Sequence, residues 1–181
     1  MSNVKRPTWA ERTPSMQDYY DHYWGLPEHD DRQLFEMLSL ELFQAGLTWR
    51  TIWARRAAFE RAFADFDIDR VAAFTAADID RLCQDQTIIR NRRKISAVVA
   101  NARVVQGLQG SGQTFDDYVW HFVDYQPQRL VLAPDESLPA QTDQSREMAK
   151  QFKTDGFRFV GPTIMYSFMT AIGLVNARIE I

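Results

Sequence analysis

Apolar residues recur every three to four positions along most of the chain, and this spacing constrains the fold more than any other feature. Residues at that spacing share one helical face, which must be buried against another element. The clearest faces are those of Leu34, Leu38, Leu42 and Ala45, and of Ile95, Val98, Ala102 and Val105. No segment shows the sustained apolar–polar alternation of a half-buried strand, and no Asn-Gly turn is present. The sequence therefore predicts an all-α fold.

Residues that begin and end helices divide this pattern into elements. Capping side chains precede several apolar runs, and Gly161-Pro162 places a proline in the first turn of a last helix. The expected caps are Asp30 or Asp31, Thr48, Asp67, Thr75, Thr114 and Thr142. One helical run is predicted over residues 49–63, and the three prolines of residues 125–141 predict a long loop. Because that loop does not separate two compositions, we expect one domain spanning residues 1–181.

Composition narrows the class of protein. The net charge of −3 argues against a protein that binds DNA through its overall charge, although a local basic patch is compatible with it. Cys83 is the only cysteine, so no intrachain disulfide is expected. The sequence shows neither a secretory leader nor a run of apolar residues long enough to span a membrane. These features predict a soluble protein of the reducing cytoplasm.

Glu41 is the residue whose position in the helical pattern is most unusual. It follows Leu38 by three positions and Leu34 by seven, so it lies on the apolar face of its helix. Burial of an unpaired carboxylate costs free energy, and such a residue needs a partner or a function. Two interpretations are open from the spacing alone. Glu41 is either a structural ion pair or loop cap, or a pocket carboxylate that binds a ligand.

Aromatic residues gather on both sides of the helix that carries Glu41. Trp9 and Tyr19 belong to a dense group before it, and Trp49 lies just after its end. Aromatic rings can hold a planar base between them. Core packing is the commoner role, and periodicity alone favours it for Trp49.

Basic residues cluster beside a tight connection between two predicted helices. Arg90, Arg92, Arg93 and Lys94 are nearly consecutive there, and such a place suits a phosphate group. A solvated helix end is the alternative interpretation. The three histidines are scattered and none is near Cys83, so no metal-ligand spacing appears.

Four segments are specific enough to suggest a family. They are residues 19–25 (YYDHYWG), 31–49 (DRQLFEMLSLELFQAGLTW), 88–92 (IIRNR) with Lys94-Ile95, and 156–176 (GFRFVGPTIMYSFMTAIGLVN). In this order, over nearly the whole chain, they resemble the 3-methyladenine DNA glycosylase I family. The resemblance implies a single-domain, all-α helix-hairpin-helix DNA glycosylase fold. It also implies an enzyme that flips 3-methyladenine out of alkylated double-stranded DNA and releases the free base by hydrolysis.

The same resemblance assigns roles to particular residues. Glu41 is expected to be the catalytic residue that reads the flipped base, with Tyr19 and Trp49 packed against that base and Trp9 contributing from the N-terminal segment. The hairpin near residues 86–92 is expected to contact the DNA backbone. The DNA-backbone residues predicted there are Arg90, Arg92 and Lys94. A monomer is expected.

The sequence departs from the family at the structural zinc that its members usually hold. Pro7 stands near the expected cysteine, Tyr20 replaces a histidine, Arg178 occupies the place of a second histidine, and no cysteine follows Arg178 up to the last residue, Ile181. We therefore expect a member without zinc, and no other cofactor. Gln86-Thr87 also replaces the small residue or glycine usual before the paired isoleucines.

A non-catalytic binder of damaged DNA or of a nucleobase remains an alternative function.

Overall fold

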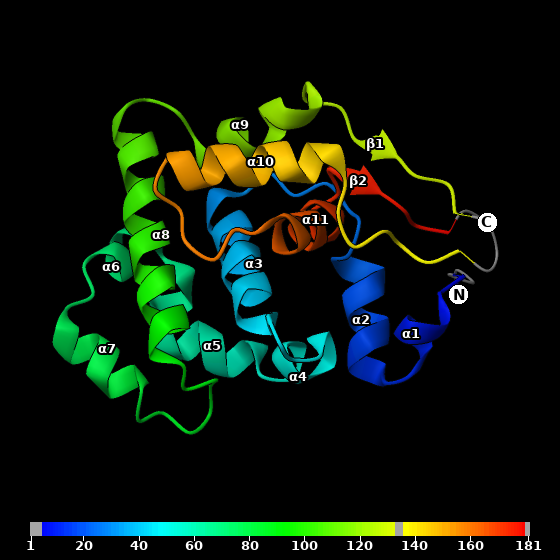
Figure 1. Ribbon diagram of the computed structural model, residues 1–181. Coiled ribbons are helices and arrows are strands. Elements are labelled where there is room, and N and C mark those ends of the chain that lie inside the picture. Colours follow the sequence, from blue (N-terminus) through cyan, green and yellow to red (C-terminus); the bar gives the residue numbers. More distant parts are fainter. Residues whose placement is uncertain (1–4, 133–135, 180–181) are drawn as a thin grey trace.

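The computed structural model describes residues 5–132 and 136–179, so Pro134 and Ile181 lie outside the described residues. Helices make up the fold (Figure 1). The α-helices are α1 (Thr8–Glu11), α2 (Pro14–His22), α3 (Asp31–Gln44), α4 (Trp49–Trp53), α5 (Arg56–Ala62), α6 (Ile68–Ala72), α7 (Ala76–Leu82), α8 (Arg92–Gly110), α9 (Phe115–Trp120), α10 (Asp143–Thr154) and α11 (Pro162–Ala171). Short 3-10 turns are η1 (Ala64–Phe66) and η2 (His121–Val123), and the strands are β1 (Gln128–Arg129) and β2 (Val175–Asn176). The prediction of an all-α fold is confirmed.

The predicted caps explain where the helices begin. Asp30 accepts a hydrogen bond from the Gln33 backbone N–H at the start of α3, and Thr75 with Asp78 forms a complete capping box at α7. The single helical run predicted over residues 49–63 was wrong, because the structure divides it into α4 and α5. A 3-10-type hydrogen bond lies between the two helices. The Arg55 N–H donates to the Ile52 carbonyl, three residues earlier, at 2.9 Å.

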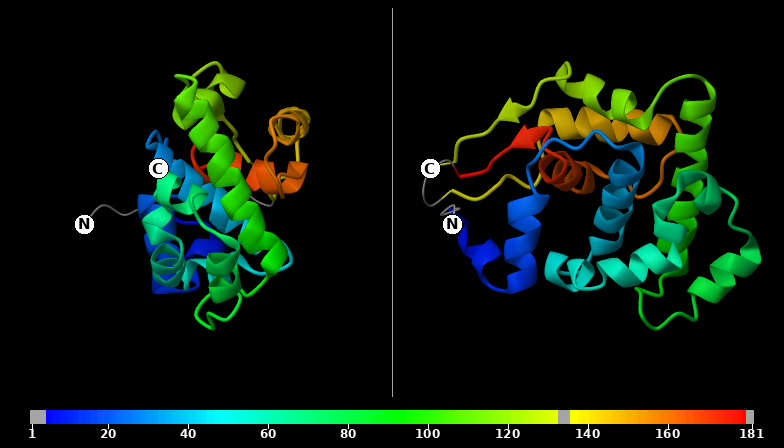
Figure 2. Two further views of the ribbon diagram at one scale, coloured as in Figure 1. Left: turned by 90° about the vertical axis from the view of Figure 1, so that its left-hand side faces the viewer. Right: turned by 180° about the vertical axis from the view of Figure 1, so that it is seen from behind.

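The central element is α3, which α4, α8, α9 and α11 surround. Figure 2 shows it from behind, between α2 and α8. Every residue from 34 to 43 is buried, polar ones included. A helix enclosed on all sides needs no polar face, and each polar side chain on it must be satisfied individually.

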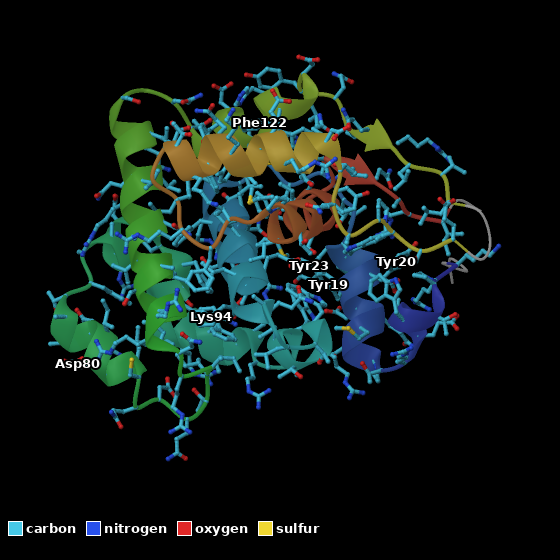
Figure 3. All side chains as sticks on the ribbon, viewed as in Figure 1. Tyr19, Tyr20, Tyr23, Asp80, Lys94 and Phe122 are labelled. Carbon is cyan, nitrogen blue, oxygen red and sulfur yellow. The ribbon has the colours of Figure 1, made fainter. Side chains whose placement is uncertain are left out.

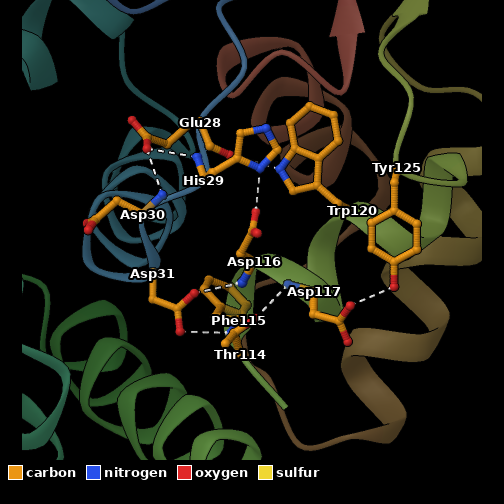
Figure 4. Close-up of polar contacts among 10 residues, drawn as sticks. All are labelled: Glu28, His29, Asp30, Asp31, Thr114, Phe115, Asp116, Asp117, Trp120 and Tyr125. Carbon is orange, nitrogen blue, oxygen red and sulfur yellow. Dashed lines mark hydrogen bonds and ion pairs between the residues drawn. The ribbon is translucent and has the colours of Figure 1, made fainter.

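Polar contacts fix the N-terminal end of α3 against α9 (Figure 4). Asp31 accepts hydrogen bonds from the backbone N–H groups of Phe115, at 2.9 Å, and Asp116, at 2.8 Å, in the first turn of α9. Nearby, His29 stacks on Trp120 with ring centroids 4.5 Å apart. A carboxylate at a helix N-terminus satisfies donors that lack a partner within the helix. This end of α3 is thus held independently of the end that carries Glu41.

The two short strands join the long loop to the C-terminal segment. β1 and β2 pair in parallel, with Gln128 opposite Val175 and Arg129 opposite Asn176. The sequence did not predict this pair, because two-residue strands show no periodicity. Among the helices of the described residues, none has the length and apolar character needed to cross a membrane.

Candidate active site

A small pocket opens beside the C-terminal half of α3. Its volume is about 200 Å³, below the roughly 300–1,000 Å³ of sites for drug-sized ligands. Its walls come from α1, α2 and the turn after it, α3, α4 and α11, with one residue from the long loop. The lining residues are Trp9, Tyr19, Trp24, Glu41, Gln44, Trp49, Leu138, Ser167 and Thr170. The fold therefore brings Glu41 together with all three predicted base-binding rings.

Aromatic rings form one wall of the pocket. The Tyr19 ring lies on the side of α2 that faces α4 (Figure 3), with its centroid 5.1 Å from that of Trp49. The Trp9 centroid is 6.3 Å from that of Tyr19 and 5.4 Å from that of Trp24. Tilted and edge-on contacts of this kind stabilise aromatic clusters.

The Glu41 carboxyl group is buried in this pocket. Its exposure is 3%, and within the described part of the chain its Oε2 atom has no hydrogen-bond partner. The Trp49 indole N–H is unpartnered in the same sense. Buried polar groups in native proteins are almost always bonded. An acceptor and a donor left unsatisfied in one pocket favour the ligand-binding interpretation of Glu41 over the structural one.

Glu36, on the same helix, is a buried carboxylate with a structural role. Its exposure is 2%, yet it accepts a hydrogen bond from Arg56 Nε at 2.6 Å. The Arg56 guanidinium also lies 4.5 Å from the Tyr23 ring centroid. Glu36 and Glu41 are equally buried, and the difference between them is the partner.

Burial raises the pKa of Glu41 from 4.5 to about 8. Between these values the folded protein holds a proton that the unfolded chain releases, so the free energy of unfolding should fall as pH rises from 5 to 8. The expected loss is roughly 3 kcal/mol, since one pKa unit corresponds to about 1.4 kcal/mol. Urea unfolding of wild type and Glu41→Gln across this range measures it, because the variant lacks only this titration. Parallel pH profiles for the two proteins would contradict the prediction.

The structure corrects the prediction that Lys94 contacts the DNA backbone. Lys94 is buried, and its Nζ donates to the backbone carbonyls of Phe43, at 2.9 Å, and Ala45, at 2.6 Å. The last carbonyls of a helix lack intrahelical partners and carry partial negative charge. Lys94 therefore caps the C-terminal end of α3, beside the pocket, and its ammonium group is not available to a phosphate.

Arg90 and Arg92, the two arginines predicted to contact the DNA backbone, are exposed, unlike Lys94. Arg90 is exposed and lines a shallow depression beside the turn between α7 and α8, together with Arg55 and Gln86. Arg92 is exposed at the start of α8 and pairs with Asp80 of α7. Both side chains are accessible, and their DNA-backbone role remains a prediction.

Sequence reasoning missed several lining residues. Gln44 follows Glu41 by three positions on α3, so helical spacing could have placed the two on one face. Ser167 and Thr170 share a face of α11 in the same way. Leu138 comes from the long loop, and no local pattern could have placed it at the pocket.

Comparison with known proteins identifies relatives with similar sequences and similar structures. The family model described as methyladenine glycosylase matches residues 9–181. The chain is 43% identical over 173 residues to DNA-3-methyladenine glycosylase 1 of Escherichia coli (strain K12), covering 96% of this chain and 92% of that protein. A crystal structure of 3-methyladenine DNA glycosylase I matches with a TM-score of 0.93 at 45% identity over 97% of both chains. The Staphylococcus aureus glycosylase, whose structure concerns recognition of 3-methyladenine, matches with a TM-score of 0.89 at 35% identity, over 93% of this chain and 90% of that one.

Proposed function

Because the chain belongs to the methyladenine glycosylase family, we propose that it flips 3-methyladenine out of alkylated double-stranded DNA and releases the free base by hydrolysis. The observation that carries this proposal is the pocket in which Glu41, whose buried Oε2 atom has no partner among the described residues, lies beside the rings of Tyr19 and Trp49. Enzymes that act on a base inside a duplex extrude it into such a pocket and hold it by stacking and edge hydrogen bonds.

The chemistry of the lesion fits this site. In DNA the methylated ring of 3-methyladenine carries positive charge, so the base is already a good leaving group. The pocket needs to hold the ring between aromatic side chains and to accept a hydrogen bond from its exocyclic amine. Glu41 supplies the acceptor, and a cationic ring beside it favours the ionised carboxylate despite the burial. Water then completes hydrolysis of the N-glycosidic bond.

A second carboxylate that could activate water is not found among the lining residues of the pocket. Asp85, the acidic residue of the turn between α7 and α8, accepts hydrogen bonds from the backbone N–H and hydroxyl of Thr87 at 2.9 and 2.6 Å. Its role is to shape that turn. The proposal therefore includes selectivity for labile, cationic bases over stable neutral ones.

The DNA surface that we propose surrounds the turn between α7 and α8, where the family's hairpin is expected. Arg90→Ala should weaken binding to all duplexes alike and make the dependence of log affinity on log salt shallower by roughly one unit. Lys150→Ala is the matched control, because Lys150 is an exposed cation on α10, across the molecule from this turn (Figure 1). Fluorescence anisotropy at several salt concentrations measures the slope. Equal slopes for both variants and wild type would place the DNA surface elsewhere.

The proposal also describes a monomer that works in the cytoplasm. Its direct test is release of free bases from DNA treated with a methylating agent, quantified by chromatography. We expect 3-methyladenine in the supernatant and the unmodified, neutral bases retained in the DNA. Binding of methylated DNA without release of any base would instead support the non-catalytic alternative.

A further inference from the structure

Arg178 occupies the contact between the C-terminal segment and α2. Its guanidinium carbon lies 4.3 Å from the centroid of the Tyr20 ring. Its Nη1 atom donates to the Tyr20 carbonyl and, at 2.5 Å, to the Trp24 carbonyl. The first carbonyl belongs to the last turn of α2, which lacks intrahelical partners and favours a cation. Arg178 thus caps α2 and the turn that follows it.

The capped backbone is the one that carries the aromatic wall of the pocket. Tyr19 and Trp24, which both line the pocket, directly adjoin the bonded segment. The Tyr20 and Trp24 rings stack 5.5 Å apart, and the Trp9 ring packs edge-on to both, at 5.7 and 5.4 Å. A shift of the Tyr20 and Trp24 backbone would therefore move the rings that face a bound base.

Other residues of this region accommodate Arg178. A Cβ atom on Gly25 would lie 2.9 Å from Arg178 Cγ and 3.3 Å from its Cδ, so the absence of a side chain at Gly25 admits the arginine stem. The Ile179 N–H donates to the Tyr20 hydroxyl at 3.0 Å, which holds the next residue against α2. Arg6 forms a two-point ion pair with Asp21 at 2.8 and 2.6 Å. The N-terminal segment at Arg6 and the C-terminal segment at Arg178 and Ile179 are thereby both joined to α2.

These contacts stand where the family's zinc is expected, and the residues present do not fit a zinc ion. Pro7 has no donor atom, and a guanidinium is a cation that remains protonated. Across residues 5–132 and 136–179, no group of three or more histidine, cysteine, aspartate or glutamate side chains could hold a metal. The chain ends are joined here by an arginine and its partners.

We propose that Arg178 is a positioning residue for the base pocket, acting through the Tyr20 and Trp24 carbonyls in place of a metal. The inference rests on the proposed function only in taking the pocket to be the site that binds the base. Its structural part, the hold on residues 19–25, is independent of the ligand.

The test compares Arg178→Met with Arg178→Lys and with Arg103→Met. Arg103 is a matched control, because it also donates to two backbone carbonyls, those of Ala72 and Phe74, each at 2.9 Å, on α8 away from the pocket. Binding of free 3-methyladenine is measured by calorimetry at a temperature where circular dichroism shows every variant folded. Arg178→Met should weaken binding at least about tenfold, because the backbone that carries the aromatic wall loses both of its bonds to the guanidinium. Arg178→Lys should restore part of it, and Arg103→Met should bind as wild type does.

Hydrogen exchange separates failure of this inference from failure of the proposed function. Amides of residues 19–25 should exchange faster in Arg178→Met than in wild type, whether or not the wild type binds 3-methyladenine. A wild type that shows no binding would count against the proposed function alone. Unchanged exchange at these amides, or wild-type affinity in folded Arg178→Met, would overturn the positioning role. So would elemental analysis that finds about one zinc per chain, or a loss of binding when a chelator is added.

Discussion

Glu41→Gln is expected to leave the protein folded and to lower the rate of 3-methyladenine excision about 10- to 150-fold. The amide keeps the volume of the side chain but replaces an acceptor with a donor, which would face the exocyclic amine of the base. It also removes the counter-charge for the cationic ring. Loss of one charge-assisted hydrogen bond corresponds to roughly 1.5–3 kcal/mol. Single-turnover release of 3-methyladenine and thermal unfolding, measured on one preparation, report both quantities.

The matched control for this experiment is Glu36→Gln on the same helix. Glu36 is as buried as Glu41 but is paired with Arg56 at 2.6 Å. Removing one partner of a buried ion pair costs roughly 3–5 kcal/mol, so this variant should lose stability and keep its activity per folded molecule. Glu41→Gln should show the opposite pattern, because the buried Glu41 Oε2 atom has no hydrogen-bond partner among the described residues. A destabilised but fully active Glu41→Gln would make Glu41 a structural residue and remove it from the catalytic site.

Lys94→Met is expected to lower the free energy of unfolding by about 3 kcal/mol, from the loss of two charge-assisted hydrogen bonds to the end of α3. For a chain of this length the midpoint of thermal unfolding should fall by roughly 6–12 °C. Methionine is the replacement of choice, since it keeps much of the buried volume. Calorimetry measures the loss, and Lys150→Met, at an exposed position of α10, should show almost none.

The same Lys94 variant also tests the correction to its predicted role. Because its ammonium group is bonded inside the protein, the salt dependence of DNA binding by the folded variant should equal that of wild type. This result would contrast with the shallower slope expected for Arg90→Ala. A normal stability combined with a slope reduced by one unit would mean that Lys94 contacts DNA after all.

Basic residues show the limit of what a local pattern reveals. Arg90, Arg92 and Lys94 form one run in the sequence, yet Arg90 is exposed, Arg92 pairs with Asp80, and Lys94 is buried under the end of α3. Whether each of these side chains is exposed, paired or buried depends on which element packs against the start of α8. That packing joins residues 94 and 43, which are 51 positions apart, and helical spacing carries no information at that distance.

The sequence by itself determined where most of the helices begin, and it indicated Glu41, Tyr19, Trp49 and Trp9 as residues of the pocket. Caps such as Asp30 and Thr75 mark where helices begin, because their side chains satisfy N–H groups that the helix leaves unpaired. The position of Glu41 on an apolar face marked it as unusual, and the resemblance of whole segments assigned the aromatic rings to it. These signals are local or are carried by residue identity.

Only the tertiary structure decided which buried charges are satisfied. Arg56 reaches Glu36, Lys94 reaches the end of α3, and no partner reaches Glu41 Oε2 among the residues described. The aromatic wall likewise depends on Arg178, which lies 158 positions from Tyr20 in the chain. The physical reason is the same for Glu36, Lys94, Glu41 and Arg178. The energy of a buried charge depends on the few atoms within hydrogen-bond distance, and in a folded chain those atoms come mostly from other elements.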